Sequence, residues 1–236
     1  MYIKSKSYAD DADCIKSLID KCAVIVDNNG YSNVDTRSAA PTNIMHIAMS
    51  AIGMTNILTF LGVDNPDIRS FTQKLLGLTK INDDTVNFMG NSISKVRTLS
   101  LCVLGQFQIE NCISNLLLVL DLSSPVGYYK KVKKIIDYLG IGEDNFRVLH
   151  TLSLIRNSLH SNGIYHGHKD SDYSTTIEGV EYNFIHNRKV TCSSMSHTAH
   201  LLERSVCVLD EIINSQTIKK ITDVIPDKYL LQTQSN

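Results

Sequence analysis

The feature that most constrains the fold is the spacing of apolar residues, which recur every three or four positions along most of the sequence. The longest such stretch runs from Ser94 to Leu122 and stops before Pro125 and Gly127. Its apolar positions are Val96, Leu99, Val103, Phe107, Ile113, Leu117 and Leu120. This period puts apolar side chains on one helical face. We therefore predict that 94–122 is the central helix of a bundle, with that face in the core.

Shorter stretches with the same period predict further helices. These are Tyr8 to Asn28, Thr42 to Leu61, a helix starting at Pro66, Tyr128 to Leu139, Glu143 to His160 and Ser194 to Ser215. A different composition, rich in β-branched and aromatic residues, marks Thr175 to Ile185 and then Lys189 to Cys192. The expected fold is mainly α, a helical bundle with a small β-hairpin or three-stranded meander inserted at about 174–192.

The helical signal is interrupted near Lys80 to Ser92, by Asn82-Asp83-Asp84 and Gly90-Asn91. We place a boundary there, between an N-terminal helical region, 1–90, and a bundle over 91–236. The tail after Asp227 is expected to fray, as chain ends commonly do.

Composition narrows the classes of function. The chain has 236 residues, 43% of them hydrophobic, and a net charge of −1, so nucleic acid would bind only at a local basic patch. Six cysteines without paired-ligand spacing predict buried thiols in a reducing cytoplasm. We expect no signal peptide and no transmembrane helix, hence no membrane partner. The sequence has no phosphate-binding glycine loop, G-x-S-x-G or H-E-x-x-H motif.

The most informative segment ends the predicted helix over 143–160. Arg156 and His160 are four positions apart, so they share one helical face with β-carbons about 5–6 Å apart. A cation thus lies beside a titratable imidazole, and His160 could act as a general acid or titrate near neutral pH. The alternative is structural, with both side chains capping carbonyls or pairing with a carboxylate on a neighbouring helix.

The run Ile155-Arg156-Asn157-Ser158-Leu159-His160-Ser161-Asn162-Gly163, at the end of a helix in a bundle, resembles the signature of the HEPN superfamily (higher eukaryotes and prokaryotes nucleotide-binding domains). Arg156, Asn157 and His160 match its motif, with three intervening residues where the family has four to six. The resemblance covers about Ser94 to Ser215. It implies a dimeric helical bundle and, in many members, a metal-independent ribonuclease of antiviral, toxin–antitoxin or other defence systems.

The resemblance also implies roles for individual residues. RNA would be cut by attack of a 2′-hydroxyl on the adjacent phosphate, with Arg156 stabilising the developing charge, His160 moving a proton and Asn157 orienting the site. The family often has an acidic or polar residue on an earlier core helix, for which Glu110 is the candidate. No cofactor is implied; RNA, a second copy in a homodimer and an antitoxin or defence-system protein are the implied partners. The other hypothesis is a non-catalytic interaction or dimerisation module.

A second candidate surface interleaves aromatic and basic residues on one helix. It comprises Tyr128, Tyr129, Lys130, Lys131, Lys133 and Lys134. Such a helix can contact phosphates and stack a base, although a solvated lysine face has the same sequence. His166-Gly167-His168-Lys169-Asp170 lacks a third well-placed ligand, so no metal site is predicted.

Overall fold

The computed structural model describes residues 5–61, 66–75, 77, 79 and 82–227. It is mainly helical with one antiparallel hairpin, which confirms the predicted fold class. The helices are α1 (Ser5–Asn29), α2 (Thr36–Leu61), α3 (Pro66–Leu75), α4 (Asp83–Val119), α5 (Tyr128–Leu139), α6 (Glu143–His160), α7 (Met195–Asn214) and α8 (Gln216–Lys219), with a 3₁₀ turn η1 (His168–Asp170). The strands are β1 (Tyr173–Ile177) and β2 (Val180–Phe184). The tail expected to fray lies outside the described residues.

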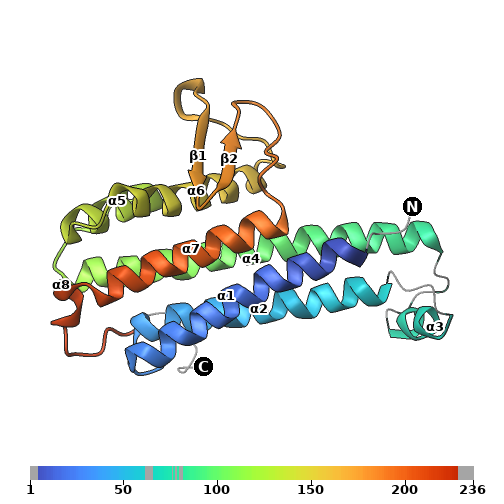
Figure 1. Ribbon diagram of the computed structural model, residues 1–236, viewed down its shortest axis with the longest axis horizontal. Coiled ribbons are helices and arrows are strands. Elements are labelled where there is room, and N and C mark those ends of the chain that lie inside the picture. Colours follow the sequence, from blue (N-terminus) through green and yellow to red (C-terminus); the bar gives the residue numbers. More distant parts are fainter. Residues whose placement is uncertain (1–4, 62–65, 76, 78, 80–81, 228–236) are drawn as a thin grey trace.

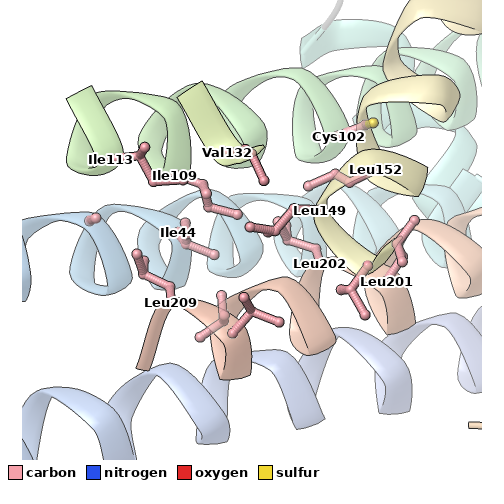
Figure 2. Packing of buried hydrophobic residues seen from close by; sticks show 14 of the residues in the cluster. Ile44, Cys102, Ile109, Ile113, Val132, Leu149, Leu152, Leu201, Leu202 and Leu209 are labelled. Carbon is pink, nitrogen blue, oxygen red and sulfur yellow. The ribbon is translucent and has the colours of Figure 1, made fainter. Parts of the chain in front are cut away.

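The bundle has three layers, visible in Figure 1. The α1–α2 pair forms one side, α4 and α7 lie in the middle, and α5 and α6 cover the other side. Figure 2 shows side chains from α2, α4, α5, α6 and α7 meeting in one core, among them Ile44, Ile109, Val132, Leu149 and Leu202. The boundary expected near residue 90 falls inside α4, and this core is continuous across it.

Two helices, α2 and α4, start more than one helical turn earlier than the sequence analysis predicted. The start of α2 is Thr36, not Thr42, because Asp35 caps it: its Oδ1 accepts a hydrogen bond from the backbone N–H of Arg37 at 2.9 Å. Pro41 then lies inside the helix. Helix α4 starts at Asp83, not Ser94, because the Asn82 side chain accepts from the backbone N–H of Thr85. The polar residues interpreted as an interruption therefore form the cap and first turn of α4.

The predicted core face of α4 is only half correct. Ile113 and Leu117 are fully buried, but Val96, Leu99 and Phe107 are 53%, 39% and 41% exposed. Over 37 residues a helix can present more than one apolar face, and here Leu101, Cys102 and Ile109 fill the core instead. The N-terminal half of α4 therefore has exposed apolar side chains, among them Val96 and Leu99.

The length of α4 also bears on the prediction that no helix spans a membrane. No spanning segment was expected, yet by length and composition α4 is long and apolar enough to cross a membrane. Of its most apolar window, 56% is buried in the bundle, as in the core helix of a folded domain.

The inserted β-structure is a hairpin of two strands. Strands β1 and β2 are antiparallel, with Tyr173 opposite Phe184 and Ile177 opposite Val180. They are joined by a tight turn at Glu178-Gly179, where both residues have positive φ. The third strand of the alternative meander does not form within the described residues, because Lys189 makes only an isolated bridge to Ile164.

Helices α4 and α7 approach closely at Gly105. A β-carbon there would lie 2.6 Å from Leu202 Cδ2, in the core. We expect Gly105→Ala to lower the free energy of unfolding by about 1 kcal/mol, because overpacking outweighs the gain in helix propensity. Gly53→Ala, in an open position on α2, should instead raise it by up to about 1 kcal/mol. Urea unfolding of both variants tests this, and stabilisation by both would contradict close packing at Gly105.

Candidate functional site

A pocket of about 500 Å³ lies where α4, α5 and α6 meet. It brings together six residues singled out in the sequence, namely Glu110, Tyr128, Tyr129, Lys130, Arg156 and Asn157. Gln106 from α4 and Ser153 from α6 also line it. Residues from two separate sequence motifs thus share one solvent-open site.

The local structure explains this convergence. Gln106 and Glu110 are four apart on α4, and Ser153 and Arg156 are three apart on α6, so each pair shares a helical face. Gly127, with φ of +93°, turns the chain into α5 and sets the first turn of that helix at the pocket. This conformation favours glycine over residues with a β-carbon.

Arg156 is half-buried and retains unused hydrogen-bonding capacity. Its Nη1 donates to Asn157 Oδ1 at 3.1 Å, the one hydrogen bond of this guanidinium within the described ranges. It also lies near Cys102, where burial raises the thiol pKa to about 12 despite the opposing effect of Arg156. Cys102 is therefore a protonated core residue and not a nucleophile.

His160 is the last residue of α6 and is exposed. It lies one helical turn beyond Arg156, outside the residues that line the pocket, and makes no hydrogen bond or ion pair with another described residue. A structural polar cluster would be buried and fully paired. Arg156 and His160 are both accessible, but of the two only Arg156 lines the pocket.

The basic stretch of α5 divides into two parts. Lys130 lines the pocket, and Lys131 Nζ forms an ion pair with Glu110 Oε1 at 2.8 Å. Lys133 pairs with Asp137 and Glu143, and Lys134 donates to the Ser123 carbonyl, so both lie away from the pocket. Lys130 and Lys131 thus belong to the candidate site, whereas Lys133 and Lys134 are held elsewhere.

The two tyrosines differ in environment. Tyr128 is buried, and burial with the nearby Glu110 raises the pKa of its hydroxyl well above the ordinary value, so it stays protonated. Tyr129 is half exposed and packs edge-on against Phe146 and His150, each with its ring centre 5.1 Å away. The hydroxyl of Tyr128 is therefore buried, whereas the ring of Tyr129 is accessible.

His150 in this aromatic cluster predicts a pH dependence of stability. Burial lowers its pKa below the ordinary 6.5, so the unfolded chain binds more protons than the folded one in that range. Stability is present above pH 6.5 and is lost progressively as pH falls toward the lowered pKa. Urea unfolding at about pH 7.5 and about pH 5.5 should show a smaller drop for His150→Phe than for the wild type. Equal drops would contradict the prediction.

The sequence analysis missed Gln106 and Ser153. A polar residue one turn before Glu110, and another one turn before Arg156, would have been the signal. Neither stands out, because polar residues are ordinary on helix surfaces.

The histidine-rich segment before the hairpin forms a local polar network. His186 Nε2 lies 3.2 Å from Asp170 Oδ1, and the Gly167 N–H donates to His186 Nδ1 at 3.1 Å. His166 contacts Asn187 at 3.1 Å. Among the residues with described positions, no three His, Cys, Asp or Glu side chains are grouped to hold a metal ion.

Comparison of the chain with protein families, with curated proteins and with solved structures found no match. The resemblance to the HEPN superfamily therefore rests on the Arg156-Asn157-x-x-His160 motif and stays a prediction.

Proposed function

We propose that this protein is a HEPN-like, RNA-binding, metal-independent endoribonuclease of a cytoplasmic defence, toxin–antitoxin or stress-response system. The observation that carries the proposal is the pocket in which Arg156, Asn157 and Glu110 meet Lys130 and Tyr129. It offers a guanidinium and an ammonium for phosphates and an aromatic ring for a base, the groups that bind single-stranded RNA.

The proposed reaction needs no group beyond the chain, its RNA and solvent water. The 2′-hydroxyl loses its proton to water as its oxygen attacks the adjacent phosphorus, the bond to the 5′-oxygen breaks, and the products are a 2′,3′-cyclic phosphate and a 5′-hydroxyl. Arg156 stabilises the extra negative charge on the phosphoryl oxygens, and His160 delivers a proton to the leaving 5′-oxygen. Asn157 holds the guanidinium in place through their hydrogen bond.

Incubation of the purified protein with mixed cellular RNA in EDTA tests the proposal. We expect fragments that end in 2′,3′-cyclic phosphate and 5′-hydroxyl. Cleavage that requires added Mg²⁺, or fragments with 3′-hydroxyl ends, would contradict the reaction. RNA that stays intact and unbound would contradict the function as a whole.

A homodimer completes the proposal, because it would set two copies of the motif across one cleft. What supports it is an apolar stripe on α4, made of the exposed residues Val96, Leu99 and Leu104. Exposed apolar patches of this kind mark interaction surfaces. We expect Leu99→Glu with Leu104→Glu to convert a dimer into a monomer in analytical ultracentrifugation, whereas Leu118→Glu, 56% exposed on the same helix, should not. A monomeric wild type would contradict the dimer.

The same stripe favours the second candidate function, a non-catalytic interaction or dimerisation module. That function predicts dimerisation through α4 with no RNA bound or cut. The RNA assay and the sedimentation measurement together separate the two functions.

A further inference from the structure

A second cavity, of about 890 Å³, lies beyond the C-terminal end of α6. Leu159, Asn162 and Gly163 line it from the end of α6 and the turn that follows. Its other walls come from α1, α4, the residues before α7 and the first turn of α7. The proposed reaction does not use this cavity, although it is larger than the pocket at Arg156.

The cavity has an excess of positive charge. Lys95 and Lys189 line it, both are exposed, and neither forms an ion pair within the part of the chain that the structure describes. Asp11 also lines it, but its carboxylate is paired with the buried guanidinium of Arg97, so these two charges compensate. The first turn of α7 contains no acidic residue. Two accessible ammonium groups therefore make this cavity suitable for a phosphate backbone.

The cavity and the pocket open on the same face of α4. Lys95 and Leu99 line the cavity. Gln106 and Glu110 line the pocket. Steps of four, seven and four positions bring all of them to one helical face, and about 10 Å of helix separates Leu99 from Gln106. Leu99 is also in the stripe of the proposed homodimer, so a partner copy would border the cavity. A bound strand that follows α4 would meet both sites.

The order of residues along α6 gives the direction of that strand. Arg156 lines the pocket, His160 follows one helical turn later, and Asn162 lines the cavity. In the proposed reaction Arg156 contacts the scissile phosphate and His160 protonates the leaving 5′-oxygen. That oxygen belongs to the nucleotide on the 3′ side of the cut. The 3′ segment of the RNA therefore leads past His160 toward the cavity.

We propose that this cavity binds the phosphates of the RNA segment on the 3′ side of the cut, with Lys95 and Lys189 as the contacts. The inference rests on the proposed function, because the proposed reaction defines the cut and its leaving group. Contacts to phosphate do not depend on the base. The cavity therefore adds affinity for the strand without adding sequence preference.

Substrates with a single 2′-hydroxyl test the proposal, because they can be cut at one bond only. Each is a 2′-O-methyl strand with one ribonucleotide. In one series the 3′ segment grows from one to five nucleotides, and in the other series the 5′ segment does. We expect a longer 3′ segment to raise kcat/KM of the wild type by about tenfold or more, as two additional phosphate contacts would.

Lys95→Ala combined with Lys189→Ala is the decisive variant, and since both side chains are exposed, folding should be unaffected. It should gain less than about twofold from a longer 3′ segment and as much as the wild type from a longer 5′ segment. Its affinity for a fully 2′-O-methylated strand should depend less steeply on salt, by about 0.7 in the log–log slope for each lost contact. Lys219→Ala with Lys220→Ala, exposed at the opposite end of α7 (Figure 1), is the matched control and should behave as the wild type.

Three results would overturn the inference: a wild type that gains nothing from a longer 3′ segment, a double variant that keeps the whole gain, or a double variant that loses the 5′ gain equally. The proposed function would survive each of them, because cleavage at the single 2′-hydroxyl would still demonstrate the reaction. If the wild type cut none of the substrates, the proposed function would fail and the inference with it.

Discussion

Arg156→Ala should reduce the rate of RNA cleavage by about 10²–10³-fold, the usual cost of losing one donor to a developing oxyanion. The guanidinium lies at the pocket and donates one hydrogen bond to Asn157. Its remaining N–H groups are therefore available to the phosphoryl oxygens. Arg156→Lys should recover only part of the rate, because an ammonium does not reproduce the bidentate geometry. Initial rates with end-labelled RNA in EDTA measure the effect.

Two further variants make this prediction specific. His160→Ala should cost about 10²–10⁴-fold, as expected for removal of a proton-transfer group. Arg147→Ala, on the same helix but paired with Asp144 at 3.2 Å and outside this pocket, should cleave at the wild-type rate. Wild-type rates in both Arg156→Ala and His160→Ala would show that the motif plays no part in cleavage.

Arg37→Met should lower the free energy of unfolding by about 3–5 kcal/mol, because it leaves the buried carboxylate of Asp35 without its positive partner. Arg37 and Asp35 are each 1% exposed and lie 2.6 Å apart. The guanidinium also donates to the carbonyls of Ile221 and Asp223, and Asp35 accepts from the Ile225 N–H. This ion pair therefore ties the start of α2 to the segment after α8.

A double-mutant comparison separates the ion pair from packing. Asp35→Asn combined with Arg37→Met removes both charges and should be less destabilising than the sum of the two single changes. Arg147→Ala, which breaks an exposed pair, should cost less than about 1 kcal/mol. If Arg37→Met lowered the free energy of unfolding by no more than Arg147→Ala does, the Asp35–Arg37 ion pair would contribute little to holding the start of α2 against the segment after α8. Urea unfolding with free energies extrapolated to water provides the values.

Local sequence patterns were sufficient for most of the fold. Helices α5 and α6 begin and end at the predicted residues, because Gly127, Gly140 and Gly142 mark their limits. The predicted start of α2 was wrong, because the capping residue Asp35 also accepts a hydrogen bond from the N–H of Ile225, which is far away in the sequence. The exposed face of α4 could not be predicted either, since apolar residues have the same period whether a partner helix covers them or not.

Sequence reasoning found part of the candidate site. The motif around Arg156 and the start of α5 were recognised separately, and only the packing of α4, α5 and α6 brings them together. The lysines looked equivalent in sequence, yet their neighbours differ: Lys131 faces Glu110, whereas Lys133 faces Asp137 and Glu143. Gln106 becomes notable only when its burial and its missing partner are known.

The most direct test of the central claim is to find where RNA contacts the protein. Ultraviolet cross-linking of an oligoribonucleotide, followed by mass spectrometry of tryptic peptides, distinguishes Tyr129 at the pocket from Tyr138, which is equally exposed on the same helix but outside it. We predict a cross-link in the peptide from Thr98 to Lys130, at Tyr129, that is lost in Arg156→Ala. Cross-links at Tyr138 with none at Tyr129, unchanged by Arg156→Ala, would contradict the claim that this pocket binds RNA.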